Sequence, residues 1–224
     1  MLPVRRGALV NHPMTNEDQK RLVALGYDKI ADDYIDRFGR SSVRTAKLAE
    51  LIAHLPAAGS VLDLGCGAGI PVVRHLVEQG FRVTGVDASS GQIERARRNV
   101  PKAEFMLADM ASVHFDPETF DAISAFYSIT HLPKSEHAAV IRRIAKWLRP
   151  GGRFLASYGT AEGDWSGEWL GTTMFFSHHN PETTKQLIQD AGLRLERVEM
   201  LKQDNEEAVF LWITAKKIVI SALY

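Results

Sequence analysis

Asp63-Leu64-Gly65-Cys66-Gly67-Ala68-Gly69 is the stretch from which the fold of this chain can be read. It joins a short apolar segment, residues 60–64, to an amphipathic segment that starts near residue 71. Glycines at such a junction let the backbone turn sharply and let a ligand approach the main chain closely, at the carboxyl edge of a sheet. A tight turn without a ligand is the alternative, but three glycines within five residues favour a binding loop.

Outward from this loop, short apolar segments alternate with amphipathic ones. We expect strands at residues 60–64, 81–86, 103–107, 120–125 and 153–158, and helices at 71–79, 89–99 and 135–148. The helix at 89–99 begins with Ser89 and Gln92 in the spacing of a capping box. Strands that alternate with helices of this length pair in parallel through right-handed crossovers. The pattern therefore predicts an α/β fold with a doubly wound sheet.

The C-terminal part breaks this alternation. A helix is expected from Asn180, the N-cap, through Pro181 to Gly192. Two strands, residues 193–200 and 208–215, then follow with only a polar turn between them. Consecutive strands joined by a short turn pair antiparallel, so the sheet should end in an antiparallel hairpin.

We expect a single domain over residues 1–224. Residues 1–56 should form a loose arm and three cap helices, and residues 57–215 the α/β core. Within the core, residues 159–180 are an insertion longer than most loops. Residues 216–224 are an apolar tail, which should pack on the core or form a homodimer contact.

Composition narrows the function classes. The 224 residues include 27 basic and 27 acidic ones, so the formal net charge is zero. Nucleic acids are held chiefly by clustered Lys and Arg, so we expect no nucleic-acid partner. Cys66 is the one cysteine, which excludes an internal disulfide and favours a reducing compartment. Apolar runs of signal-peptide or membrane-span length are missing, which predicts a cytoplasmic protein with no membrane contact. The histidines and acids lack metal-ligand spacing, so we predict no metal.

The loop does not fit a dinucleotide. The G-x-G-x-x-G fingerprint starting at Gly65 requires glycine at position 70, where this chain has Ile70. Asp63 would also repel a pyrophosphate, whereas a cationic ligand would tolerate it. Asp87 and Asp109 follow the second and third expected strands, and a carboxylate at Asp87 can accept both hydroxyls of a ribose. Acids at three successive strand ends should converge on one crevice.

Several motifs together resemble class I S-adenosylmethionine-dependent methyltransferases, in particular the branch that acts on small molecules. They occur in that family's order, at residues 61–69, 83–89, 107–110, 120–123 and 148–152. The resemblance covers roughly residues 20–215. It implies a Rossmann-like, doubly wound, seven-stranded sheet with an antiparallel last strand and an N-terminal helical cap.

The resemblance also implies a set of cofactor contacts. Gly65 and Gly67 would pass under the methionine part of S-adenosyl-L-methionine, which Asp63 would orient. Asp87 would hold the ribose. The remaining cofactor contacts implied are the following: Asp109 and Met110 beside the adenine, Cys66 through its backbone, Ala88, Phe126, and Tyr34 in preference to Tyr27.

The methyl acceptor should lie beside the segment after the fourth strand, which includes Tyr127 and His131. His131 is read either as a catalytic base beside the methyl group or as a cap of the next helix. The insertion 159–180 is read either as a lid over a flat acceptor or as a flap packed on the N-terminal helices. Its candidate residues are the base His178 and the substrate contacts Trp165, Trp169, Phe175, Phe176 and His179.

These observations predict methyl transfer to an oxygen or nitrogen of a small, aromatic or hydrophobic metabolite. The Asn-Pro-Pro-Tyr motif typical of base and glutamine methylation is missing after the fourth strand. A protein that binds the cofactor without transferring its methyl group is the alternative, because intact glycines and acids do not separate the two.

Overall fold

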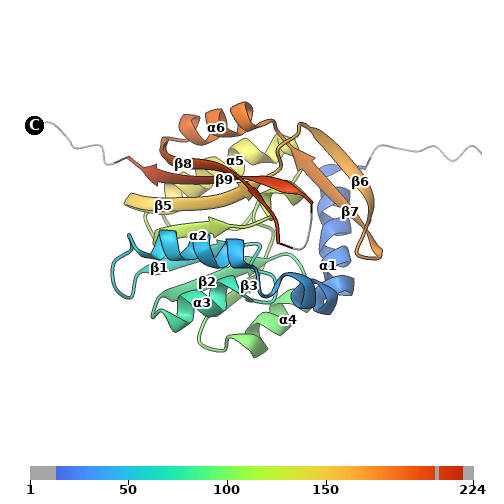
Figure 1. Cartoon of the computed structure of the whole chain (residues 1–224), viewed down its shortest axis with the longest axis horizontal. Coiled ribbons are helices and arrows are strands. Elements are labelled where there is room, and N and C mark those ends of the chain that lie inside the picture. Colours follow the sequence, from blue (N-terminus) through green and yellow to red (C-terminus); the bar gives the residue numbers. More distant parts are fainter. Residues whose placement is uncertain (1–13, 205–206, 219–224) are drawn as a thin grey trace, which may run out of the picture.

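The computed structural model describes residues 14–204 and 207–218 and contains a seven-stranded sheet in the order β3-β2-β1-β4-β5-β9-β8 (Figure 1). The strands are β1 (Ser60–Leu64), β2 (Arg82–Asp87), β3 (Glu104–Leu107), β4 (Phe120–Ala125), β5 (Leu148–Tyr158), β8 (Leu193–Lys202) and β9 (Val209–Lys217). The strands β1 to β5 pair in parallel, and β9 is antiparallel to both of its neighbours. The predicted doubly wound sheet with an antiparallel last strand is confirmed.

Helices cover both faces of this sheet. They are α1 (Asn16–Phe38), α2 (Ser42–Ile52), α3 (Val72–Glu78), α4 (Ser90–Asn99), α5 (Lys134–Trp147) and α6 (Pro181–Asp190). Consecutive β1 residues point to opposite faces, so Val61 packs in the core under α2, α3 and α4, and Leu62 in the core under α5 and α6. Because both faces are buried, the parallel strands are apolar on both sides.

From residue 14 onward, two helices and not the expected three precede the first strand. Residues 16–38 form the single helix α1, whose N-cap Thr15 makes a capping box with Asp18. Gly26 lies inside this helix without ending it. A Cβ at Gly26 would come within 2.6 Å of the Met174 sulfur, so the glycine provides room for a neighbouring strand.

That neighbour belongs to the insertion 159–180, which corrects our expectation of a long loop. The insertion contains β6 (Gly163–Trp169) and β7 (Thr172–His178), an antiparallel hairpin outside the main sheet. Figure 1 shows the hairpin beside α1 at one end of the molecule. The Trp169 ring stacks on Phe38 of α1, with centroids 6.1 Å apart. Of the two readings, the packing therefore matches a flap on the N-terminal helix.

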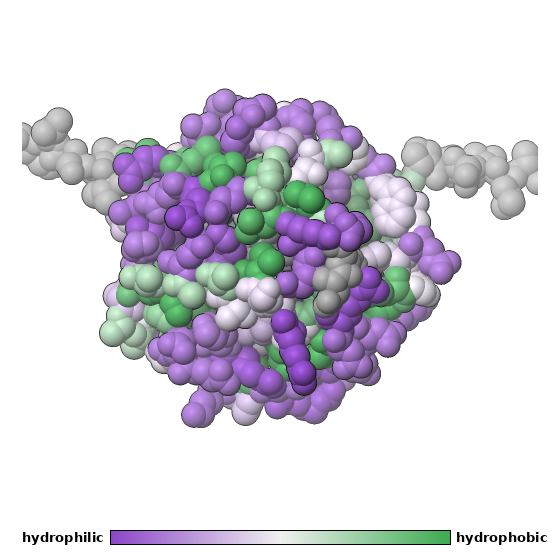
Figure 2. All heavy atoms as spheres, in the orientation of Figure 1, coloured by the Kyte–Doolittle hydropathy of each residue, from purple (hydrophilic) through white to green (hydrophobic). Residues whose placement is uncertain are grey.

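Edge strand β8 exposes apolar and charged side chains together. Val198 and Met200 are exposed, and Figure 2 shows hydrophobic residues scattered among hydrophilic ones on this face. Glu199 of this strand pairs with the buried Lys47 of α2. Charged side chains on an edge strand disfavour pairing with another strand. Residues 219–224 of the apolar tail lie outside the described residues, and the homodimer stays a prediction.

None of the described helices is long and apolar enough to cross a membrane.

Candidate active site

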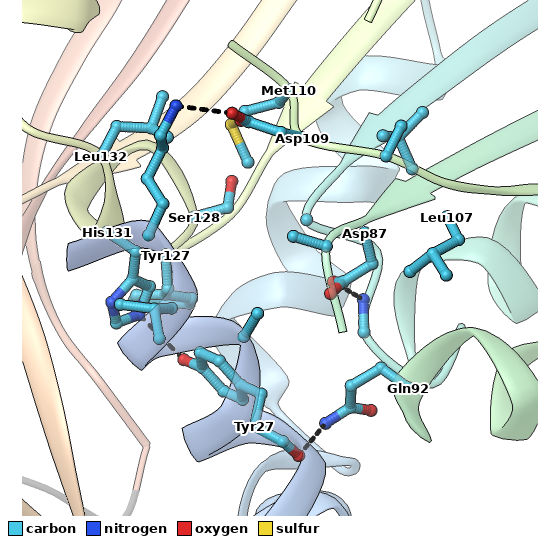
Figure 3. A pocket seen from close by; sticks show the side chains of 18 of the residues that line it. Tyr27, Asp87, Gln92, Leu107, Asp109, Met110, Tyr127, Ser128, His131 and Leu132 are labelled. Carbon is cyan, nitrogen blue, oxygen red and sulfur yellow. Dashed lines mark hydrogen bonds and ion pairs between the residues drawn. The ribbon is translucent and has the colours of Figure 1, made fainter. Parts of the chain in front are cut away.

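A cavity of about 310 Å³ opens where the carboxyl ends of β1, β2, β3 and β4 meet α1 (Figure 3). Its floor comes from the loops after these strands and its roof from α1. The lining residues are Glu17, Lys20, Arg21, Val23, Ala24, Tyr27, Tyr34, Gly65, Gly67, Val86, Asp87, Ala88, Gln92, Leu107, Ala108, Asp109, Met110, Phe126, Tyr127, Ser128, His131 and Leu132. The sheet edge thus brings together most of the residues predicted to bind the cofactor.

The glycine loop forms the floor in a conformation that requires glycine. Gly65 and Gly67 have φ angles of 76° and 53°. A Cβ at Gly65 would lie 2.2 Å from the Ser128 Cβ, so a side chain has no room there. The N–H groups of Gly65 and Cys66 both donate to the Val86 carbonyl, at 2.8 and 3.0 Å. The loop is therefore held closely against the end of β2.

Asp87, at the end of β2, presents a partly buried carboxylate to the cavity. Its two oxygens accept the N–H of Gly67 at 2.8 Å and the N–H of Ser89 at 2.9 Å. Burial raises the pKa of Asp87, and these two hydrogen bonds oppose that rise. A carboxylate oxygen can accept more than one hydrogen bond, so this group can also receive ligand hydroxyls.

Asp63 lies behind the loop and does not line the cavity. Only 2% of the residue is exposed, and its Oδ1 accepts the Ser124 hydroxyl at 2.7 Å. Burial raises the pKa of Asp63 to about 7. The positive charge of Arg44 acts in the opposite direction. The structure therefore places Asp63 where it can influence a ligand through its charge.

Arg44 of α2 brings a buried positive charge to the same end of the cavity. It is 4% exposed and lies over the Tyr127 ring, 4.7 Å from the centroid. Its Nη2 donates to the Tyr34 hydroxyl at 2.7 Å. Its Nε has no hydrogen-bond partner among the described residues. Tyr34 and Tyr127 both line the cavity, so the guanidinium lies directly behind this wall.

Asp109, after β3, links the cavity floor to α1. Its Oδ1 accepts the Ala111 N–H at 2.8 Å, and its Oδ2 pairs with Lys20 at 2.7 Å. Lys20 also lies 3.3 Å from a carboxylate oxygen of Glu136 on α5. Met110 lines the cavity beside this cluster (Figure 3). The ion pairs therefore hold the N-terminal half of α1 over the cavity mouth.

His131 and Tyr27 form a hydrogen-bonded pair on the cavity wall. His131 ends the short helix η1 (Ile129–His131), and Tyr27 lies on α1. The Phe175 carbonyl lies 2.8 Å from Nδ1 of His131 and can only accept, so Nδ1 carries the proton and Nε2 the lone pair. The Tyr27 hydroxyl, 2.9 Å from Nε2, then donates to it. Burial lowers the pKa of His131 to about 4, so the imidazole is neutral at pH 7.

The other candidates of the insertion do not line the cavity, because the hairpin packs behind α1 and η1. His178 lies 2.8 Å from the Thr130 hydroxyl, and His179 packs edge-on against the His137 ring. Phe176 packs on the outer side of the His131 ring, with centroids 4.6 Å apart, and Phe175 contributes its carbonyl. Trp165 is 48% exposed. The expected lid position is thus corrected: α1 provides the roof.

Sequence reasoning did not single out Lys20, Arg44 or Gln92 as site residues. Lys20 and Arg44 look like ordinary charges on helices, and only packing places them at the cavity. Gln92 fits a capping-box pattern, and the Ser89 hydroxyl does accept its backbone N–H at 3.1 Å. Its side chain, however, donates to the Tyr27 carbonyl at 3.4 Å. Across residues 14–204 and 207–218, no cluster of three or more His, Cys, Asp or Glu could hold a metal ion.

Comparison with known proteins adds an independent observation. Residues 61–152 match the family model described as a methyltransferase domain. The 27-O-demethylrifamycin SV methyltransferase of Amycolatopsis mediterranei is 37% identical over 153 residues, 58% of this chain and 56% of that protein. The trans-aconitate 2-methyltransferase of Paracidovorax citrulli is 38% identical over 113 residues, 49% of this chain and 43% of that protein. The chain thus spans about half the length of these relatives.

Solved structures resemble the whole fold. Burkholderia thailandensis 1,6-didemethyltoxoflavin-N1-methyltransferase, solved with 1,6-didemethyltoxoflavin and S-adenosylhomocysteine, has a TM-score of 0.75 at 21% identity and covers 94% of each chain. The [4+2]-cyclase SpnF has a TM-score of 0.61 at 18% identity and covers 86% of this chain and 81% of its own. At these identities the likeness establishes the fold.

Proposed function

Because this chain contains a class I S-adenosylmethionine-dependent methyltransferase domain, we propose that it transfers a methyl group from S-adenosylmethionine to an oxygen or nitrogen of a small, aromatic or hydrophobic metabolite. One observation carries the proposal. A single cavity contains the glycine loop, the Asp87 carboxylate and the Tyr27–His131 pair. Cofactor and acceptor can therefore meet in one space roofed by α1.

The residues present fit the cofactor. Gly65 leaves room for Ser128 to pack against the glycine loop, and both residues line the cavity. Asp87 offers acceptors for ribose hydroxyls, and Asp109 and Met110 would flank the adenine. Arg44 would attract the carboxylate of the methionine part from behind the cavity wall. When bound, the cofactor supplies a methyl group that is activated by its sulfonium charge.

The Tyr27–His131 pair can manage the acceptor's proton. Nε2 of His131 already receives the hydrogen bond of the Tyr27 hydroxyl. A proton leaving an acceptor hydroxyl or amine can pass to the Tyr27 oxygen while the Tyr27 proton moves to Nε2. The Phe175 carbonyl fixes the ring orientation and stabilises the imidazolium that results. The low pKa of His131 means that this proton is soon released, which suits turnover.

The cavity favours a compact acceptor. Its acceptor side includes the apolar residues Val23, Ala24 and Leu132 beside Tyr27 and His131. Cofactor and acceptor would share this cavity of about 310 Å³, which is at the small end of ligand pockets, so little of the space is left for the acceptor. The hairpin residues Trp165, Trp169 and Phe176 support this site from outside α1, so the contacts with the acceptor would come from α1 and η1.

Binding without methyl transfer is the second candidate. The likeness to the [4+2]-cyclase SpnF supports it, because that protein shares the fold and is described by a reaction other than methylation. Turnover separates the two candidates.

Calorimetry with S-adenosylhomocysteine tests the first step of the proposal. We expect binding to the wild-type chain and a loss of about tenfold or more in Asp87→Ala, because a partly buried acceptor of ligand hydroxyls is removed. A panel of phenols, carboxylic acids and amines, followed by mass spectrometry, tests methyl transfer. Stoichiometric binding of the cofactor, with no S-adenosylhomocysteine formed from any acceptor, would favour the second candidate. If the chain did not bind the cofactor at all, both candidates would be refuted.

Two variants test the proton path once an acceptor is found. Tyr27→Phe and His131→Asn should lower kcat by about 100-fold, the lower range of general-base catalysis, while the Kd for S-adenosylhomocysteine changes less than threefold. His54→Asn, on the exposed segment after α2, controls for a histidine substitution. Equal losses in kcat and in cofactor affinity would contradict the assigned role.

A further inference from the structure

Gln92 is a cavity-lining residue whose buried side-chain oxygen has no hydrogen-bond partner among the described residues. The residue is 1% exposed, yet its Oε1 receives no hydrogen bond within the described part of the chain. Buried acceptors are nearly always satisfied, by protein or by something bound. An unsatisfied oxygen on a residue that lines the cavity therefore points to a donor on a bound ligand.

The position of this oxygen identifies the part of the ligand it would meet. A Cβ at Gly67 would lie 3.7 Å from Gln92 Oε1, so the oxygen lies beside the glycine loop. The Gly67 N–H in turn donates to Asp87 Oδ2 at 2.8 Å. Two groups that only accept, the Asp87 carboxylate and Gln92 Oε1, thus border one corner of the cavity. A ligand with two neighbouring hydroxyl donors, such as a ribose, complements this arrangement.

The other end of the same amide contacts α1. Gln92 Nε2 donates to the Tyr27 backbone carbonyl at 3.4 Å, and Figure 3 shows this contact beside the cavity. The carbonyl fixes the orientation of the amide, because a carbonyl cannot receive a hydrogen bond from Oε1. The Tyr27 side chain reaches His131 from the same residue. One amide therefore connects the ribose corner with the proton-handling pair.

We propose that Gln92 is a positioning residue that couples the bound cofactor to Tyr27. Its Oε1 accepts a ribose hydroxyl, and its Nε2 then holds the Tyr27 carbonyl, so that the Tyr27 hydroxyl stays on Nε2 of His131 when the cofactor is bound. The inference rests on the proposed function, because it takes the ribose of S-adenosylmethionine as the ligand group.

Gln92→Met and Gln92→Glu separate the two ends of the amide. Methionine keeps the length and removes both polar atoms, whereas glutamate keeps an acceptor and removes the donor to Tyr27. Gln186→Met is the matched control, because the Gln186 amide also donates on a helix, to Asp190, but on the exposed face of α6. Calorimetry with S-adenosylhomocysteine and with its 2′,3′-dideoxy analogue gives the first readout.

We expect Gln92→Met to weaken S-adenosylhomocysteine binding about tenfold and to leave binding of the dideoxy analogue unchanged. A merely structural role would weaken both ligands equally, and that result, or no change for either, would overturn the proposal. Failure of the wild-type chain to bind S-adenosylhomocysteine would instead refute the proposed function and this inference with it.

Nuclear magnetic resonance of ¹⁵N-labelled histidine gives the second readout. In the wild-type chain, and in Gln186→Met, saturating S-adenosylhomocysteine should shift the Nε2 signal of His131, because the ordered Gln92 amide strengthens the hydrogen bond that Tyr27 already donates to that atom. In Gln92→Glu and Gln92→Met at saturation, this shift should be lost. An unchanged shift in both Gln92 variants would show that Tyr27 does not sense the cofactor through this amide.

Discussion

Replacing His131 with asparagine should change how stability depends on pH. The neutral imidazole is 7% exposed, and burial lowers its pKa to about 4, whereas histidine in an unfolded chain titrates near pH 6.5. Between these two pKa values, His131 binds a proton in the unfolded state but not in the folded state. The contribution of His131 to stability is therefore complete above about pH 6.5 and falls as the pH drops toward 4.

The size of this effect follows from the two pKa values. Going from pH 7 to pH 5, the wild-type chain should lose about 2 kcal/mol of unfolding free energy through His131 alone. His137, whose pKa burial also lowers to about 4, adds a loss of the same sign. Asp63, whose pKa burial raises to about 7, acts in the opposite sense, because its folded form holds a proton that the unfolded form releases. Both residues remain in the variant, so their effects cancel in the comparison.

Asparagine at 131 keeps an N–H that can donate to the Phe175 carbonyl and removes the titratable nitrogen. Urea unfolding followed by circular dichroism at pH 7 and pH 5 measures the effect. The variant should be less stable at pH 7 but should lose about 2 kcal/mol less than the wild type on acidification. His54→Asn controls for the substitution itself. Equal losses in the wild type and in His131→Asn would refute the assignment of a neutral, buried His131.

Three further substitutions test the loop, the roof and the hairpin. Gly65→Ala should destabilise the chain by at least about 1 kcal/mol more than Gly80→Ala, because both glycines have positive φ but only a Cβ at Gly65 would collide with Ser128. Thermal unfolding measures both variants, and equal destabilisation would contradict close packing of the glycine loop against Ser128. Lys20→Met should lower the free energy of unfolding in urea by about 1–2 kcal/mol and speed tryptic cleavage in α1, because the carboxylate partners of Lys20 lose their cation. Unchanged stability would show that these ion pairs do not hold α1 in place. Trp165→Ala should leave S-adenosylhomocysteine affinity within about twofold, because the side chain is outside the cavity; a larger loss in calorimetry would restore the lid reading.

The elements that could be predicted from sequence depend on short-range patterns. Three local patterns predict structure within a few residues: the short apolar run of the strand SVLDL, the glycines that allow a sharp turn after it, and the N-cap residue Ser89. Predictions from such short patterns are reliable because the residues involved are neighbours in space as well as in sequence. Local patterns predicted three helices before the first strand, whereas residues 16–38 form one helix, in which Gly26 makes room for Met174.

The hairpin shows where local patterns stop. The hairpin carries large aromatic side chains, Trp165, Trp169 and Phe176, which predict packing against another part of the chain. The local sequence does not identify that part. The partner is α1, more than 100 residues earlier in the chain, and the contact between Tyr27 and His131 spans 104 positions. Such contacts are set by how helices and strands pack, which depends on the whole core.

By itself, the sequence determined the doubly wound sheet, the glycine loop and the carboxylates at the strand ends, because each is specified by a local pattern and by the rule that parallel strands present their carboxyl ends at one edge. Only the tertiary structure decided that α1 roofs the cavity, that Tyr27 donates to His131, and that the Gln92 side chain donates to the Tyr27 carbonyl. These features depend on the packing of segments that are far apart in the chain. Many apolar surfaces could pair with one another, and the fit of their close contacts decides which of them do.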